Sequence, residues 1–137
     1  MVERKILDEE LLRTPVNLVW DHVLMLPIVG LLDSMRTQNI MEIALAKIQE
    51  TRARVLIIDI MGVAVMDEAV AEHIIKITRA AKLMGCECIL TGVSPDIARN
   101  IVSRGLDLGD LRTHATIRDG LEMAFRVLGL EVRKSEG

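Results

Sequence analysis

Aromatic residues are almost absent from this sequence of 137 residues, which contains one Trp, one Phe and no Tyr. Proteins that bind single-stranded nucleic acid stack the bases on aromatic side chains, so the composition excludes that class. Acidic residues (20) outnumber Lys and Arg (17), and the net charge of −3 offers no general attraction for a phosphate backbone. We therefore expect no nucleic-acid partner.

Long apolar runs are also absent. The aliphatic stretches stop well short of the roughly 20 residues that a membrane-spanning helix needs. The first ten residues, MVERKILDEE, are charged throughout and lack the apolar centre of a signal peptide. We therefore expect no membrane association and a cytoplasmic location. Half of the residues are hydrophobic, which is enough for one domain with a real core.

Several motifs that carry chemistry are missing. No glycine-rich loop ends in Gly-Lys-Ser/Thr, no GxGxxG follows a strand, and GxSxG is absent. The three His residues show no ligand spacing, so neither a metal nor a cofactor is expected. Cys86 and Cys88 lie two apart in an expected strand, which is poor geometry for a disulfide. We predict that both cysteines are core residues.

Apolar periodicity predicts an alternation of strands and helices. Aliphatic runs predict strands at 16–20, 22–32, 54–60 and 86–91, the first two forming a hairpin around Asp21-His22. Residues three or four apart predict helices at about 35–51, from Asp67 to Gly85, at 95–104, and after Thr116, with a short strand before the last. Pro27 predicts a bulge, an edge or a break. This order predicts an α/β fold: a mixed, mostly parallel sheet of four to five strands with packed helices.

The caps and buried faces of these helices are also predicted. Asp33 or Ser34, then Asp67, Ser94 and Thr116 are the expected caps. The expected buried side chains are Met41, Ala44, Leu45 and Ile48; Val70, Ile74, Ile77, Ala81 and Met84; Ile97, Ala98, Ile101 and Val102; and Leu121, Ala124, Phe125 and Leu128.

Asp67 and Glu68 stand where a strand hands over to a helix. A helix N-terminus presents unpaired N–H groups and a partial positive charge, so simple capping accounts for both acids. A second interpretation places a phosphorylation switch here, its hydroxyl replaced by Glu68. A third uses Asp59, Asp67 and Glu68 as ligands for Mg²⁺ or Ca²⁺. Asp59 and Thr91 resemble the acceptor pair of a receiver domain, but the acidic pair that such a domain needs is incomplete. We expect Asp59 to bond to loop amides.

Four stretches together are more specific than any single motif. They are DIMGVAVMD (59–67), LMGCECILTG (83–92), SPDIA (94–98) and GLDL (105–108). They resemble the STAS domain of anti-sigma-factor antagonists and sulfate transporters, over residues 12 to 129. Within that family the chain is most similar to the RsbR-type co-antagonists of the stressosome, and next to the RsbS-type scaffold.

The resemblance implies the STAS fold and a regulatory, non-enzymatic task in a bacterial stressosome-type complex. Its expected partners are STAS paralogues (scaffold and co-antagonist) and a serine/threonine switch kinase, with a homodimer or larger oligomer. A simple soluble antagonist that binds an anti-sigma kinase is the alternative. Residues 1–13 are expected to be the remnant of a linker helix that follows a sensory domain in co-antagonists, 14–130 the STAS domain, and 131–137 a polar tail.

The family modifies a Ser or Thr directly after the capping Asp, and here Glu68 holds that position. Phosphate brings about −1.5 to −2 charges and Glu one, so Glu68 is either a phosphomimetic or a natural lock. Asp67 and Asp59 are expected to support the site, and Thr91 and Ser103 are candidates for a second phosphorylated residue. The loops 62–72 and 92–96 are expected to meet, because parallel strands end on one edge. The expected partner surface consists of Gly62, Val63, Asp67, Glu68, Glu72, Gly92, Ser94 and Asp96.

Overall fold

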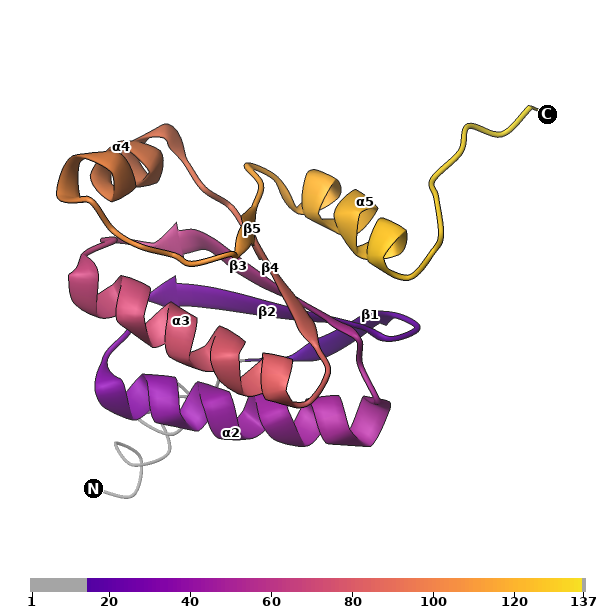
Figure 1. The fold of residues 1–137 in the computed structure, drawn as a ribbon, viewed down its shortest axis with the longest axis horizontal. Helices are drawn as coiled ribbons and strands as arrows, with labels where there is room; N and C mark the ends of the chain where they lie inside the picture. Colours follow the sequence, from indigo (N-terminus) through magenta and orange to yellow (C-terminus); the bar gives the residue numbers. More distant parts are fainter. Residues whose placement is uncertain (1–14, 137) are drawn as a thin grey trace, which may run out of the picture.

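A five-stranded sheet forms the centre of the fold in the computed structural model, which describes residues 15–136. The strands lie in sequence order, β1-β2-β3-β4-β5, with β1 antiparallel to β2 and all other neighbours parallel. Figure 1 shows the twisted sheet between its helices. The strands are β1 (Asn17–Trp20), β2 (Val23–Gly30), β3 (Val55–Val63), β4 (Glu87–Thr91) and β5 (Arg112–Thr113). The predicted mixed, mostly parallel sheet is confirmed, as is the hairpin.

Helices cover both faces of the sheet unequally. Two helices pack side by side on one face, a third crosses the other face, and a fourth lies at a corner (Figure 1). In chain order they are α2 (Ser34–Thr51), α3 (Glu68–Leu83), the corner helix α4 (Pro95–Arg104), and α5 (Ile117–Val127) on the opposite face. The larger core lies under α2 and α3, and a smaller one lies under α5. None of the helices within residues 15–136 is long and apolar enough to cross a membrane.

Local signals placed the element boundaries well. Asp33, Ser94 and Thr116 each accept a hydrogen bond from the backbone N–H three residues on, as predicted for N-caps. The pairing of β2 with β3 shifts register between Pro27 and Val29, so of the three alternatives for the proline the bulge is correct. Residues 131–136 are exposed and have no regular structure, whereas the predicted linker helix 1–13 falls outside the described residues.

Some predicted buried faces are wrong. Met84 lies beyond the end of α3 and is 43% exposed. In α4 only Ile97 is buried, while Ala98 is exposed and Val102 is 82% exposed. The reason is that α4 lies at a corner of the sheet rather than over its face, so only Ile97 and the partly buried Ile101 pack against the core. In α2 the buried stripe is Thr37, Ile40, Ala44 and Ile48, with Met41 and Leu45 at its partly buried edge.

Candidate functional site

The carboxyl ends of β2, β3 and β4 meet at one edge of the sheet, because these strands run parallel. The three loops that follow them, 31–33, 64–67 and 92–94, lead directly into α2, α3 and α4. Figure 1 shows the starts of α2, α3 and α4 gathered at this end of the molecule. The candidate site lies on this edge.

Asp67 is the N-cap of α3. Its carboxylate Oδ1 accepts from the Val70 N–H at 2.9 Å, and its carbonyl accepts from the Ala71 N–H at 3.0 Å. Glu68 is the first residue of the helix, and its side chain is exposed. The position that the sequence singled out therefore directly follows the cap, and its side chain is exposed to solvent.

A buried polar pair ties the β3 and β4 ends together. The Thr91 hydroxyl donates to Asp59 Oδ1 at 2.7 Å, and the Met61 N–H donates to Asp59 Oδ2 at 3.4 Å. Gly92 has φ +79°, and a Cβ there would lie 2.5 Å from the Met61 nitrogen and 2.7 Å from Asp59 Oδ1. Only glycine allows so close an approach. On the other side, Gly120 of α5 packs on Thr91, because a Cβ there would lie 2.3 Å from Thr91 Cγ2.

Arg36 in the first turn of α2 binds the backbone at the end of β2 and in the loop 31–33 that follows it. Its guanidinium Nη1 donates to the carbonyls of Val29 and Leu31, the latter at 2.6 Å. Val29 lies after the register shift, where β2 still pairs with β3, and Leu31 directly follows the end of β2. Sequence analysis missed Arg36, because a side chain that binds backbone carbonyls leaves no motif.

Half of the predicted partner surface is exposed. Gly62, Glu68, Glu72 and Asp96 face solvent, and Asp67 and Ser94 are partly exposed. The prediction that Val63 and Gly92 belong to the partner surface is wrong, because both residues are buried. Val63 is part of the core under α3, and the backbone around Gly92 is enclosed by Asp59 and Met61.

Exposed apolar side chains border the same edge and were missed. They are Val29, Leu31, Met61 and Val65, and Leu31 and Met61 are 75% and 63% exposed. The sequence predicted a strand over 22–32 and a buried strand over 54–60, and it made no prediction about the exposure of Val29, Leu31, Met61 or Val65. Pro27 and Gly62 were the available signals, because the register of β2 against β3 shifts after Pro27 and the shifted strands pair at Val29 and Gly62.

The two candidate second phosphosites differ in accessibility. Thr91 has no exposed surface and its hydroxyl is engaged by Asp59. Ser103, near the end of α4, is exposed, and its hydroxyl makes only a 3.4 Å contact with the Asn100 carbonyl. A kinase reaches Ser103 without unfolding, whereas Thr91 would have to leave the interior.

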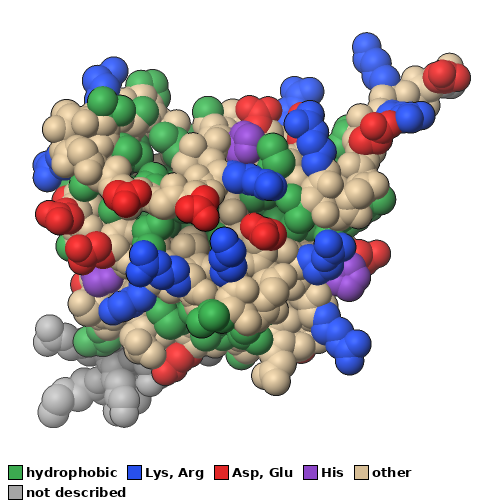
Figure 2. All heavy atoms as spheres, in the orientation of Figure 1, with side chains coloured by type: hydrophobic (Ala, Val, Ile, Leu, Met, Phe, Trp, Pro, Cys, Tyr) green, Lys and Arg blue, Asp and Glu red, His purple; other side chains and the backbone are tan. Residues whose placement is uncertain are grey.

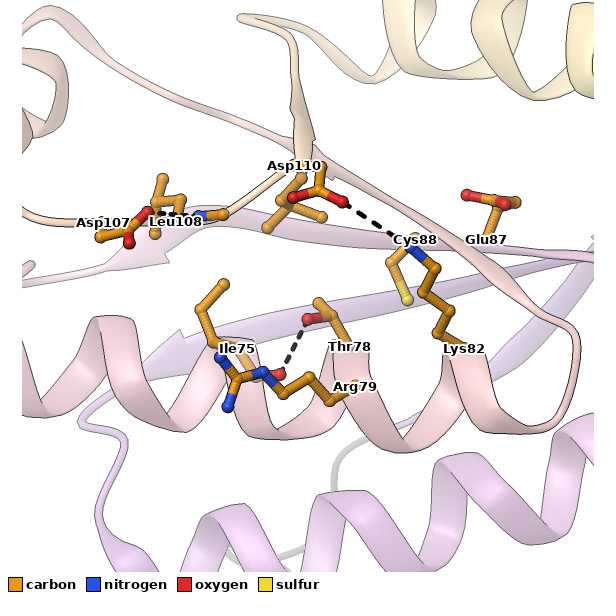
Figure 3. A pocket seen from close by; sticks show the side chains of 11 residues that line it. Ile75, Thr78, Arg79, Lys82, Glu87, Cys88, Asp107, Leu108 and Asp110 are labelled. Carbon is orange, nitrogen blue, oxygen red and sulfur yellow. Dashed lines mark hydrogen bonds and ion pairs between the residues drawn. The ribbon is translucent and has the colours of Figure 1, made fainter.

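Two adjoining hollows lie along α3, from Glu68 at its start to Lys82 near its end, and the second also reaches Cys88 of β4. One, of about 540 Å³, lies between α3 and residues 104–107 and has Glu68 in its wall. The other, of about 270 Å³, continues toward Lys82 and Asp110, as Figure 3 shows. The hollows share Ile75, Arg79 and Asp107. The flank of α3 is therefore recessed along most of its length.

The geometry does not support a metal site, and it places the two cysteines in the core. Within residues 15–136 no three His, Cys, Asp or Glu side chains come together as a ligand set. Cys86 and Cys88 are free and pack in the larger core. Burial raises the pKa of the Cys86 thiol from 9.0 to about 12, with a further contribution from Glu87. Burial likewise raises the pKa of Cys88. Both are core thiols and not nucleophiles.

Comparison with known proteins adds a family and several relatives. A model of the STAS domain matches residues 15–120. The RsbT co-antagonist protein RsbRA of Bacillus subtilis is 38% identical over 116 residues, which is 85% of this chain and 42% of that protein. A blue-light photoreceptor of Listeria monocytogenes is 29% identical over 121 residues, which is 88% of this chain and 48% of that protein. The chain thus spans less than half the length of both relatives.

Solved structures show the same fold. A serine-to-glutamate variant of RsbS from Moorella thermoacetica has a TM-score of 0.71 at 30% identity, covering 86% of this chain and 99% of that chain. A chain of the stressosome, described as a signal integration and transduction hub, has a TM-score of 0.65 at 27% identity, covering 83% and 98%. The unphosphorylated anti-sigma factor antagonist SpoIIAA has a TM-score of 0.64 at 18% identity, covering 88% and 100%, which is a likeness of fold alone.

Proposed function

The chain belongs to the STAS domain family, and on this premise we propose that it is a regulatory module that works by exchanging protein partners. It assembles with related STAS proteins in a stressosome-type complex and holds or releases a serine/threonine kinase. The charge at position 68 controls the exchange. The module itself catalyses no reaction.

The observation that carries this proposal is the placement of Glu68. It is exposed, it directly follows the capping Asp67, and it lies where three loops of the sheet edge converge. A negative group here interacts favourably with the helix N-terminus, and any partner that covers the edge meets it. A phosphoryl group at this position would add roughly one charge more than glutamate and three strong acceptor oxygens.

The relatives support the same interpretation. The names of the B. subtilis proteins describe co-antagonists of RsbT, and a matching structure is part of the stressosome. The M. thermoacetica RsbS was solved as a serine-to-glutamate variant, which is the kind of change that distinguishes Glu68 from the Ser or Thr of the family pattern. Around it, Met61 and Val65 provide the apolar surface that a protein partner buries.

The test is to restore a hydroxyl at position 68. We expect Glu68→Ser and Glu68→Thr to become substrates of the cognate serine/threonine switch kinase. Incorporation of radioactive phosphate, with the site located by mass spectrometry, measures this. Glu72→Ser is the matched control, because it places a hydroxyl on the same helix face one turn later and should stay unlabelled. A kinase that labels a paralogue but neither position-68 variant would refute the switch.

A further inference from the structure

The solvent face of α3 carries charges that are segregated by sign. Along the helix its exposed charged residues are Glu68 and Glu72, followed by Lys76, Arg79 and Lys82. Figure 2 shows red side chains over the start of α3 and blue ones further along it. The helix dipole explains acids in the first turn and bases in the last, but its effect does not extend beyond those turns. Glu72, Lys76 and Arg79 lie between them and need another explanation.

Within residues 15–136 these central charges make no ion pairs. Each of the other three helices has one internal ion pair, Lys47–Glu50 in α2, Asp96–Arg99 in α4 and Arg118–Glu122 in α5. Glu72 and Lys76 stand four apart with the acid first, which is the favourable order, yet no ion pair forms. Within residues 15–136, Lys76 and Arg79 have no partner, while Lys82 reaches Asp110 at 3.8 Å (Figure 3).

An antiparallel copy of the same helix supplies the missing partners. If the two-fold axis passes between Ile75 and Lys76, Glu72 of each chain faces Arg79 of the other. Seven residues of helix separate the two contacts by about 10 Å. The acidic half of one α3 then lies along the basic half of the other, so the surface is complementary to itself. Ile75, which is partly exposed, packs at the centre against the apolar stem of Lys76 from the second copy.

We propose that α3 is a docking surface for a second copy of this chain, in this antiparallel register. The hollow of about 540 Å³ beside Glu72 and Arg79 leaves this flank of the helix uncovered by its own chain. The same register brings Lys82 of the second copy to the first turn, so that the partner contributes a cation beside Glu68. This part deepens the proposed function, because the charge at position 68 then also strengthens self-association.

Charge reversal tests the register. We expect Arg79→Glu and Glu72→Lys each to weaken the dimer about tenfold or more, because one substitution replaces two symmetric attractions with repulsions. The double variant Glu72→Lys/Arg79→Glu should restore affinity to within about threefold of the original, since the swapped charges again face one another. Sedimentation equilibrium over a concentration series gives the dissociation constants. Circular dichroism confirms that each variant is folded.

Arg118→Glu is the matched control, because it reverses an exposed arginine on α5, on the opposite face of the sheet, and should leave the dimer unchanged. A chain that stays monomeric throughout, or a dimer that tolerates both single reversals, would overturn the proposal. So would a double variant as weak as either single one. None of these variants changes position 68, so phosphorylation of Glu68→Ser remains a separate test of the proposed function.

Discussion

Thr91 has no exposed surface, and its hydroxyl donates to the buried carboxylate of Asp59 at 2.7 Å. The bond joins the last residue of β4 to the middle of β3. Met61, further along β3, and Gly92, directly after β4, close around the same carboxylate. At the scale of single residues, this pair positions the proposed site, although Thr91 has no exposed surface and Asp59 is buried.

Thr91→Val tests this role, because valine keeps the shape and removes the donor. We expect the free energy of unfolding to fall by about 1–3 kcal/mol, since a buried carboxylate loses its hydroxyl partner. Urea unfolding followed by circular dichroism measures it. Thr113→Val in the exposed strand β5 is the control and should stay within about 0.5 kcal/mol. Equal stability of Thr91→Val and the original chain would show that Asp59 needs no such partner.

The start of α3 is the element on which the proposed switch depends. Asp67 accepts from the Val70 N–H and so keeps the first turn, with Glu68 in it, in one conformation. By contrast, α4 is held mainly through Ile97 and leaves Val102 and Ser103 exposed. The two helices that border the edge therefore differ in how firmly the core holds them.

Removing the N-cap of α3 measures how much it contributes to stability. We expect Asp67→Ala to lower the free energy of unfolding by about 1 kcal/mol, because one N–H of the first turn loses its acceptor. Hydrogen exchange should quicken at Val70 and Ala71 and stay unchanged in α5. Asp67→Asn, which keeps the acceptor, is the control and should lose much less. Equal losses for Ala and Asn would mean that charge, and not capping, is what Asp67 supplies.

At the scale of the whole molecule, partner exchange follows from overlap of two surfaces. The edge proposed for the kinase and the face proposed for self-docking share Glu68 and Glu72. A partner that covers one surface therefore obstructs the other. The exposed apolar residues Val29, Leu31 and Met61 lie at the sheet edge and not on α3. This part of the surface proposed for the kinase is therefore not shared with the face proposed for self-docking.

Mass in solution separates an assembly module from a simple antagonist. We expect light scattering to show a particle far larger than a dimer when the chain is mixed with the matching scaffold protein and the kinase. The chain without the scaffold is the control. One-to-one binding of kinase, with no larger particle in the mixture, would instead support the simple anti-sigma-factor antagonist and remove the stressosome-type assembly.

The residues by themselves determined the order of elements, the mostly parallel sheet and the helix caps. These depend on interactions within a few residues: the period of the apolar positions, and a side chain at Asp33, Ser94 or Thr116 that accepts from the N–H three residues on. They also marked Asp67 and Glu68, because an acidic pair between a strand and a helix is visible in the sequence.

Only the tertiary structure decided which of the apolar and charged residues face solvent. Val102 belongs to a helical pattern that predicts burial, yet it is exposed, while Val63 and Gly92, predicted to lie on the partner surface, are buried. The clamp by Arg36 and the unpaired Arg79 have the same origin. Exposure and pairing depend on what the rest of the chain places alongside a residue, and the neighbours that decide it are distant in sequence.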